Sequence, residues 1–165
     1  MAFTKTQIGI AAGAGSLLVL IFLGYLWWLS NQPPVLERSE DHDPLTGLPI
    51  EIKLNPLRDR STEHAANKFL REMSDGHCDE LLSKWEHDYH KHYARYICKT
   101  EAQHPLISWQ LADWEDARPF IILHYRAKRL SNAGPTQSGV DQDLFTLTMA
   151  HQAGDWVVTK YDAMY

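Results

Sequence analysis

The sequence predicts a small α+β domain that follows one membrane-spanning helix and a connector. Three observations carry this prediction: an uncharged apolar run near the start, a proline-rich segment after it, and a final part in which two helical patterns precede four strand patterns. We therefore divide the chain into residues 1–30 (tail and membrane helix), 31–60 (connector) and 61–165 (extramembrane domain).

The apolar run extends from Ile8 to Leu29 and contains no charged residue. Its length corresponds to roughly 33 Å of helix, compared with about 30 Å for the hydrocarbon core of a bilayer. The alternative is a cleavable signal peptide, in which an apolar region of about 7 to 15 residues ends at small residues. Here the small residues, Ala11–Ser16, lie at the beginning of a longer run. The pattern favours an anchor that is retained.

Two features of this segment indicate how it would sit in a membrane. Tyr25, Trp27 and Trp28 lie near its carboxyl end, where amphipathic rings favour the headgroup layer. Gly9 and Gly13 form a GxxxG spacing that lets a second helix approach closely, although small residues are also common in membrane helices without such a role. We expect contact with the lipid bilayer and allow for a helical partner.

Charges and cysteines indicate the orientation. The amino side of the run carries Lys5, whereas the other side carries Arg38 among acidic residues, and basic residues tend to stay in the cytoplasm. Cys78 and Cys98 are an isolated pair, which in a small domain outside the cytosol commonly forms a disulfide; two buried free thiols are the alternative. We expect a single-pass protein of the cell (inner) membrane, with a cytoplasmic amino terminus and a periplasmic or extracellular domain.

The connector is marked by five prolines among charged residues, which exclude a continuous helix because each proline removes a backbone donor. Within it, Ile50–Leu54 alternates apolar and polar residues and predicts a short edge strand. Gly47 lies in a turn-like sequence, PLTGLP.

Two helical patterns follow. The first begins at Ser61 or Thr62, either of which can cap a helix, and stops at Gly76. The second runs from about Asp79 to Glu101 and ends before Pro105. Its apolar positions form an aromatic-rich stripe that we interpret as core: Leu81, Leu82, Trp85, Tyr89, Tyr93, Tyr96 and Ile97.

Four strand patterns complete the chain. They cover Leu106–Trp114, Pro119–Leu130, Asp143–His151 and Trp156–Tyr161, with a glycine turn between the last two. In the first strand, Ile107, Trp109 and Leu111 alternate with polar or small residues. Short or polar connections favour an antiparallel sheet with the helices on one face, and we expect this sheet to curve around them.

The order of elements resembles the cone-shaped nuclear-transport-factor-2-like fold. The residues that carry the resemblance are AANKFLREMSDGHCDELLSKW (Ala65–Trp85), which looks like the helix, glycine turn and helix opening of that superfamily, and the closing AGDWVVTKYD (Ala153–Asp162). The resemblance covers about residues 60–165 and implies helices in the concavity of a bent sheet. Membrane-anchored versions of the fold, such as lumazine-binding-like domains of unknown function and a periplasmic component of type IV secretion systems, make an assembly role plausible.

Enzymatic members of such folds need an acid or base that faces the hollow. On the second strand, the more apolar set Ile121, Leu123, Tyr125 and Ala127 is the expected core lining, together with Phe145, Leu147 and Met149. His124 and Arg126 then point outward, and this direction argues against a buried catalytic pair. If the faces were reversed, His124 with Asp113 or His151 would be the first acid–base candidates.

Metal and nucleotide chemistry find little support. His87 and His90 would share a helix face and could hold zinc or copper, but solvated surface histidines explain them as well, and no HExxH or CxxC occurs. No phosphate-binding glycine motif or hydrolase elbow is present, so we expect no cofactor. A formal net charge of −5 gives no basic footprint for nucleic acid.

The sequence thus favours a non-enzymatic protein that acts through protein contacts as an accessory or assembly subunit of a larger membrane complex. The alternative is a tethered cone that binds a small molecule or catalyses a reaction. A hollow filled by Trp85, Tyr89, Trp109 and Phe145 would favour the first, and an apolar pocket with inward-facing ionisable groups would favour the second.

Overall fold

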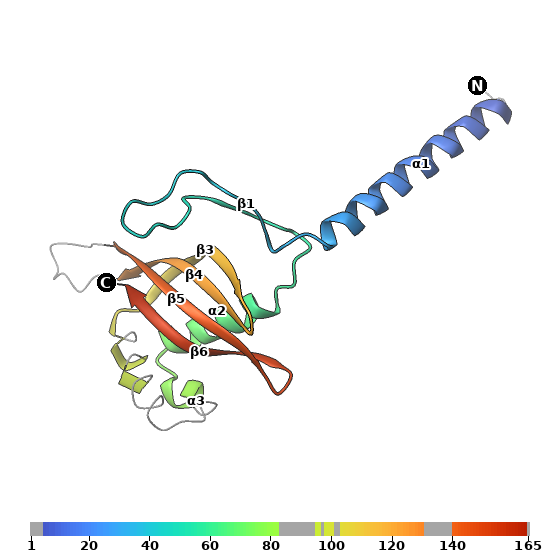
Figure 1. Cartoon of the computed structure of the whole chain (residues 1–165). Coiled ribbons are helices and arrows are strands. Elements are labelled where there is room, and N and C mark those ends of the chain that lie inside the picture. Colours follow the sequence, from blue (N-terminus) through green and yellow to red (C-terminus); the bar gives the residue numbers. More distant parts are fainter. Residues whose placement is uncertain (1–4, 83–94, 97, 101–102, 131–139, 165) are drawn as a thin grey trace.

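The structure, a computed structural model, describes residues 5–82, 95–96, 98–100, 103–130 and 140–164 (Figure 1). The helices are α1 (Lys5–Ser30), α2 (Ser61–Ser74) and α3 (Cys78–Leu82). The strands are β1 (Val35–Arg38), β2 (Ile52–Leu54), β3 (Leu106–Ala117), β4 (Phe120–Leu130), β5 (Val140–Gln152) and β6 (Asp155–Met164).

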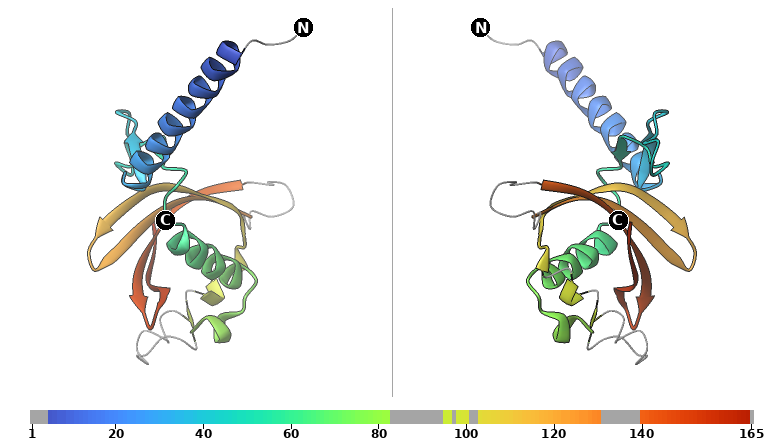
Figure 2. Two further views of the ribbon diagram at one scale, coloured as in Figure 1. Left: turned by 90° about the vertical axis from the view of Figure 1, so that its right-hand side faces the viewer. Right: turned by 90° about the vertical axis from the view of Figure 1, so that its left-hand side faces the viewer.

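Strands β3 to β6 form one antiparallel sheet in sequence order, which confirms the predicted α+β class. Figure 2 shows the sheet arching over α2, which lies in its concavity, while α1 and the connector lie on the opposite, convex side. Two tight turns join neighbouring strands. Arg118–Pro119 joins β3 to β4, and Ala153–Gly154, both with positive φ, joins β5 to β6.

The main core lies between α2 and the concave face. Leu123, Tyr125 and Ala127 of β4 are buried there, so the predicted assignment of faces is confirmed. From β5 the core receives Phe145, Leu147 and Met149, and from α2 it receives Ala66, Leu70 and Met73. Ring contacts add to this packing. Phe145 stacks on Tyr125, with ring centroids 5.4 Å apart.

Helix α2 ends as predicted but begins differently. At its end, His77 N–H donates to Glu72 O (2.9 Å) and Gly76 N–H donates to Met73 O (3.1 Å), with Gly76 at φ 76°. This is a Schellman arrangement, which favours glycine at that position. At its start, the capping role expected for Ser61 or Thr62 is wrong. Asp59 instead accepts from Ser61 N–H (2.8 Å) and Ser61 Oγ (2.9 Å).

The second helical region is described only in parts: α3 (Cys78–Leu82), 95–96 and 98–100, all helical. The predicted disulfide Cys78–Cys98 is present, with Cα atoms 5.7 Å apart, and both cysteines are buried. Leu81 is buried as expected, but Tyr96 is 69% exposed, so its place in the predicted core stripe is wrong. Tyr96 lies two residues before Cys98, which puts it on the opposite side of the helix from the buried sulfur. The stripe residues Trp85, Tyr89, Tyr93 and Ile97 lie outside the described residues.

Strand β3 departs from the simple alternation read from the sequence. Ile107, on the apolar side of that alternation, is 51% exposed, whereas Asp113 and Trp114 are both buried. The register shifts between Leu106 and Ser108 and again between Leu111 and Asp113. Each bulge moves the following side chains to the other face, which a strict two-residue period does not anticipate.

The connector is folded onto the convex face of the sheet. Strands β1 and β2 pair antiparallel, and the predicted strand Ile50–Leu54 is confirmed in its second part as β2. Leu48 packs with Ala112 and Leu144 to form a second, small core on that face. The turn before it is ordered by Asp43, whose carboxylate accepts from Leu45 N–H (2.9 Å), and this hydrogen bond lowers the pKa of Asp43.

The junction between α1 and the domain centres on Asn55, which is 1% exposed. Its Nδ2 donates to Leu29 O (2.8 Å) at the end of α1 and to Gln32 O (3.2 Å), while its Oδ1 accepts from Leu57 N–H (2.9 Å). Asn55 N–H also donates to Pro34 O (2.9 Å). One buried amide therefore binds the end of α1 to the strand that leads into the domain.

Helix α1 has side chains described from Leu17 onward. In this part they are largely exposed, for example Leu18 (67%), Leu20 (65%) and Trp27 (73%). Within the described residues, no helix combines the length and the hydropathy needed to cross a membrane. Membrane anchoring stays a prediction.

Replacement of Asn55 by alanine will destabilise the fold. The change removes the bonds of the buried amide to the Leu29 and Gln32 carbonyls and to the Leu57 N–H, and leaves the Leu29 carbonyl with Gln32 N–H (3.1 Å) as its remaining donor. We expect a loss of about 1–3 kcal/mol in the free energy of unfolding. Denaturant unfolding of the detergent-solubilised protein, followed by circular dichroism, measures it. Asn31→Ala is the matched control, because exposed Asn31 also donates to a helix carbonyl, Trp27 O (2.7 Å), and should change stability far less. Equal losses in the two variants would contradict the role given to Asn55.

Candidate functional site

A cleft with a volume of about 340 Å³ brings together two tryptophans and several polar side chains of the described residues. It lies at the amino-terminal end of α2, and we call it the indole cleft after its two tryptophans. Its lining comes from five parts of the chain: Pro34, Asp59, Thr62, the β3–β4 hairpin (Trp114, Asp116, Arg118, Pro119, Phe120 and Ile121) and Trp156.

The fold assembles this lining from separate elements. Trp114 lies on β3 opposite Leu123, on the concave face, and the β3–β4 turn brings Pro119 and Phe120 to the rim. Thr62 lies in the first turn of α2, Asp59 lies two residues before that helix, and Trp156 is the second residue of β6. Phe120 is 42% exposed, so an aromatic edge stands open to solvent.

Three hydrogen-bond donors of the indole cleft form no hydrogen bond with a described residue. Thr62 (2% exposed) and Trp114 (6% exposed) are buried, yet neither the Thr62 hydroxyl nor the Trp114 indole N–H bonds to any described residue. The Trp156 indole N–H likewise has no bond within the described part of the chain. By contrast, Trp109, outside the cleft, donates its indole N–H to Asn67 Oδ1 (2.7 Å). The cleft therefore offers unused hydrogen-bond donors between apolar walls.

Charges lie at the rim of the cleft. Asp116 pairs with Arg118 (3.1 Å), and both side chains are exposed. The Ser61 backbone N–H holds the pKa of Asp59 below its usual value, with a further contribution from the Ser61 hydroxyl. Asp59 is thus a carboxylate at neutral pH, and the rim carries two negative charges and one positive charge.

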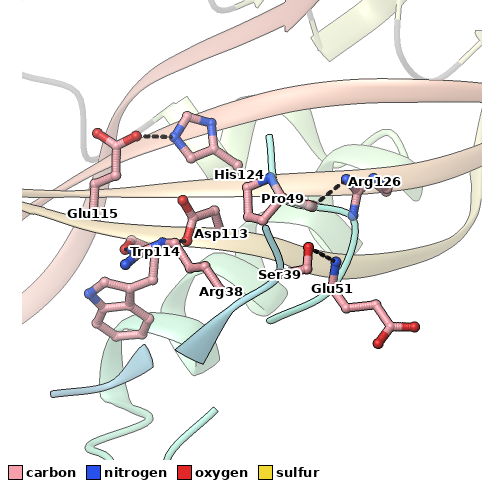
Figure 3. A network of polar contacts seen from close by, with 9 residues as sticks. All are labelled: Arg38, Ser39, Pro49, Glu51, Asp113, Trp114, Glu115, His124 and Arg126. Carbon is pink, nitrogen blue, oxygen red and sulfur yellow. Dashed lines mark hydrogen bonds and ion pairs between the residues drawn. The ribbon is translucent and has the colours of Figure 1, made fainter. Parts of the chain in front are cut away.

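A second polar cluster lies on the convex face, where it fixes the connector to the sheet (Figure 3). Arg38 donates to Asp113 Oδ1 (2.8 Å) and to Trp114 O (2.7 Å). Arg126 donates to Pro49 O (2.7 Å) and Ile50 O (3.1 Å). These contacts cross between the connector and strands β3 and β4, so the cluster serves to hold the domain together.

Two of the three acid–base candidates, His124 and Asp113, belong to this polar cluster. His124 and Asp113 are cross-strand neighbours, but they bond to different groups. His124 contacts Thr146 Oγ1 (3.0 Å) and Glu115 Oε1 (3.1 Å), while Asp113 accepts from Arg38. His151 lies on β5 and packs edge-on against Trp156, with centroids 5.3 Å apart. The structure therefore brings no two of the three together as a hydrogen-bonded pair, and His124 points away from the hollow as predicted.

The concave side holds a few polar groups among apolar ones. Burial raises the pKa of the Tyr125 hydroxyl, with a smaller effect from Glu63, and this hydroxyl has no hydrogen-bond partner among the described residues. Glu63 forms a well-buried ion pair with Arg58 (2.6 Å). The Tyr161 hydroxyl accepts from Arg129 (2.9 Å), which also pairs with Asp143. Phe145 fills the hollow as expected, and Trp109 packs against its core while half-buried.

The remaining candidates are only partly placed. His87 and His90 lie outside the described residues, and no group of three or more potential metal ligands occurs within the described ones. Gly9 and Gly13 belong to α1. Near the end of that helix, Tyr25 and Trp28 pack with ring centroids 5.9 Å apart, and both are about half exposed.

Comparison with solved structures supports the class of fold. No family model and no curated protein matches the chain. Among solved structures, it is similar to a designed nuclear-transport-factor-2-like protein, with a TM-score of 0.52, 12% identity, and coverage of 64% of this chain and 97% of that one. A further match is the intermembrane space region of the chloroplast protein ARC6, with a TM-score of 0.40, 14% identity, and coverage of 66% and 98%. The first likeness supports a nuclear-transport-factor-2-like cone fold.

Sequence reasoning did not find the indole cleft. Its residues are spread from Pro34 to Trp156, and none of its segments matches a catalytic or ligand-binding motif. The available signal was two tryptophans near the ends of strands, each close to turn-forming residues. That signal is also typical of ordinary core packing.

The contact of Asp59 with α2 makes stability depend on pH. Because folding lowers the pKa of this carboxyl, its contribution is complete above the unfolded-state value of about 3.9 and is lost as the pH falls through the lower folded value. We expect Asp59→Ala to lower the unfolding free energy at pH 7 by about 0.5–1.5 kcal/mol. The difference from the parent protein should shrink below about pH 3.

Denaturant unfolding at a series of pH values measures this difference. Asp41→Ala is the control, because the exposed Asp41 side chain has no recorded bond to a described residue. A difference between Asp59→Ala and the parent protein that stayed constant down to pH 2 would contradict the assignment.

Proposed function

We propose that this protein is a single-span membrane protein whose cone-like domain stands outside the cytoplasm and binds other proteins, as an accessory or assembly subunit of a larger membrane complex. The observation that carries the proposal is an apolar helix joined firmly to a folded domain whose described hollow is filled by its own side chains.

The apolar helix supports membrane anchoring. Helix α1 is continuous over 26 residues, or about 39 Å, which exceeds the hydrocarbon thickness of about 30 Å. Its described part exposes apolar side chains all round, including Leu17, Leu20 and Leu23. A helix of this kind is stable when a partner or a bilayer covers it. Tyr25, Trp27 and Trp28 would lie at the headgroup layer on the side of the domain.

The disulfide supports a location outside the cytoplasm. The bond Cys78–Cys98 joins α3 to the later helical residues and is buried against the main core. Such bonds persist in oxidising compartments such as the periplasm or the extracellular space. The basic residue Lys5 before α1 agrees with a cytoplasmic amino terminus.

The junction between α1 and the domain supports a function in binding other proteins. Because Asn55 and the convex-face cluster fix both ends of the connector, the domain would be held at a defined position beside the bilayer. The described hollow is occupied by Phe145, Leu147 and Leu70, each at 0% exposure. This packing favours a protein that presents surfaces over one that encloses a substrate.

A second candidate is a tethered small-molecule-binding or catalytic domain. The observation in its favour is the indole cleft, whose volume of about 340 Å³ lies within the usual range of ligand sites. Its rim carries ionisable groups, but no pair of them is arranged as a hydrogen-bonded acid and base.

A reporter fused after Tyr165 tests the topology. We expect an enzyme that is active only after export, such as a periplasmic phosphatase, to be active in this fusion, because the span would place the carboxyl terminus outside. A reporter that functions only in the cytoplasm, fused at the same point, serves as the control. Activity of the cytoplasmic reporter with silence of the exported one would contradict the topology.

Gentle detergent extraction of the full chain, followed by mass spectrometry of the proteins that co-purify, tests the assembly role. We expect defined membrane-protein partners, and we expect Gly13→Leu to reduce their recovery if the small face of α1 contacts them. Gly24→Leu is the matched control, because a Cβ at Gly24 meets no other atom within 4 Å. A monomer purified alone, with a small molecule bound, would overturn the proposal in favour of the second candidate.

A further inference from the structure

The indole cleft has the chemistry of a surface that binds hydrogen-bond acceptors. Its unused polar groups are the indole N–H of Trp114 and of Trp156 and the hydroxyl of Thr62, and two of these three residues are more than nine-tenths buried. These donor atoms are open to solvent in the free protein, and a ligand carbonyl can take the place of that solvent at each of them. The ligand should therefore present carbonyl oxygens and few N–H groups of its own.

The walls of the cleft select the shape of that ligand. Flat rings and prolines line it: Pro34, Trp114, Pro119, Phe120 and Trp156. Proline-containing segments in the polyproline II conformation offer apolar rings together with exposed carbonyls, and they lack the backbone N–H at each proline. Aromatic-lined grooves with indole donors suit such segments, which also lose little conformational entropy on binding.

The rim adds a preference for charge. The lining carries two carboxylates, Asp59 and Asp116, and one guanidinium, Arg118, which is exposed and already paired with Asp116. An arginine or lysine next to the prolines of the ligand would balance the remaining negative charge.

We propose that the indole cleft binds an extended, proline-containing segment of a partner protein that carries a basic residue. The inference rests on the proposed function, since it names the kind of segment that a partner subunit supplies. Pro34, four residues after the last residue of α1, lines the cleft, so a segment close to a partner's own membrane span can reach it.

Nuclear magnetic resonance of the full-length, ¹⁵N-labelled protein in detergent micelles tests the proposal. The chain has 6 tryptophans, and each gives its own indole N–H signal. The probe is a blocked oligoproline peptide with one central arginine. We expect the Trp114 and Trp156 signals to shift on its addition, while the signal of Trp109, bonded to Asn67, stays in place. A glycine–serine peptide of equal length with one arginine should cause no shift.

Matched variants connect the binding to individual donors. Thr62→Val and Trp156→Phe each remove one donor while keeping most of the apolar contact, and each should weaken peptide binding about 10-fold. Trp109→Phe removes an indole outside the cleft and should leave the affinity unchanged. The dispersion of backbone amide signals shows whether each variant is folded.

Several results would overturn the inference. These are an absence of indole shifts at about 1 mM peptide, equal shifts with the glycine–serine peptide, or unchanged affinity in folded Thr62→Val and Trp156→Phe. If partners still co-purify in those cases, the inference fails while the proposed function stands. Loss of all co-purifying proteins would refute the proposed function instead.

Discussion

The attachment of the connector at both its ends is the constraint on which the rest of the structure depends. Asn55 binds the end of α1, and Arg38 and Arg126 bind the connector to β3 and β4. A proline-rich segment of this length would otherwise be a loose linker. Here Arg38 of the connector donates to Asp113 and Trp114 of β3, and Arg126 of β4 donates to the Pro49 and Ile50 carbonyls of the connector. These bonds, with those of Asn55, join helix, connector and sheet.

The sequence predicted the parts of the fold that depend on local periodicity. The alternation along the predicted strands Pro119–Leu130 and Asp143–His151 identified the core face, and Gly76 and Gly154 marked a helix end and a hairpin turn. The errors have physical causes. Bulges in β3 changed the exposure of Ile107, and the disulfide fixed a helix face that leaves Tyr96 outside. The folding of the connector depends on hydrogen bonds between residues about 75 positions apart, such as Arg38 with Asp113, which no local pattern records.

The candidate site was less predictable than the fold for the same reason. The sequence singled out His124 and Asp113 for their chemistry, and the structure uses both to join strands and connector. The indole cleft draws on distant segments, and its distinguishing property is the absence of hydrogen bonds to Trp114, Trp156 and Thr62 in the described part of the chain. Such a property can be recognised only when the hydrogen-bond partners of each group in the folded chain are known.

The most direct test of the central claim is whether the domain is fixed to α1. Spin labels can be placed on cysteines introduced at Phe22 of α1 and Lys128 of β4, both exposed, because the native cysteines are bonded to each other. Electron paramagnetic resonance then gives the distribution of distances between the labels in detergent or lipid. We predict a single narrow distribution that broadens in Asn55→Ala. A broad distribution in the parent protein would contradict it.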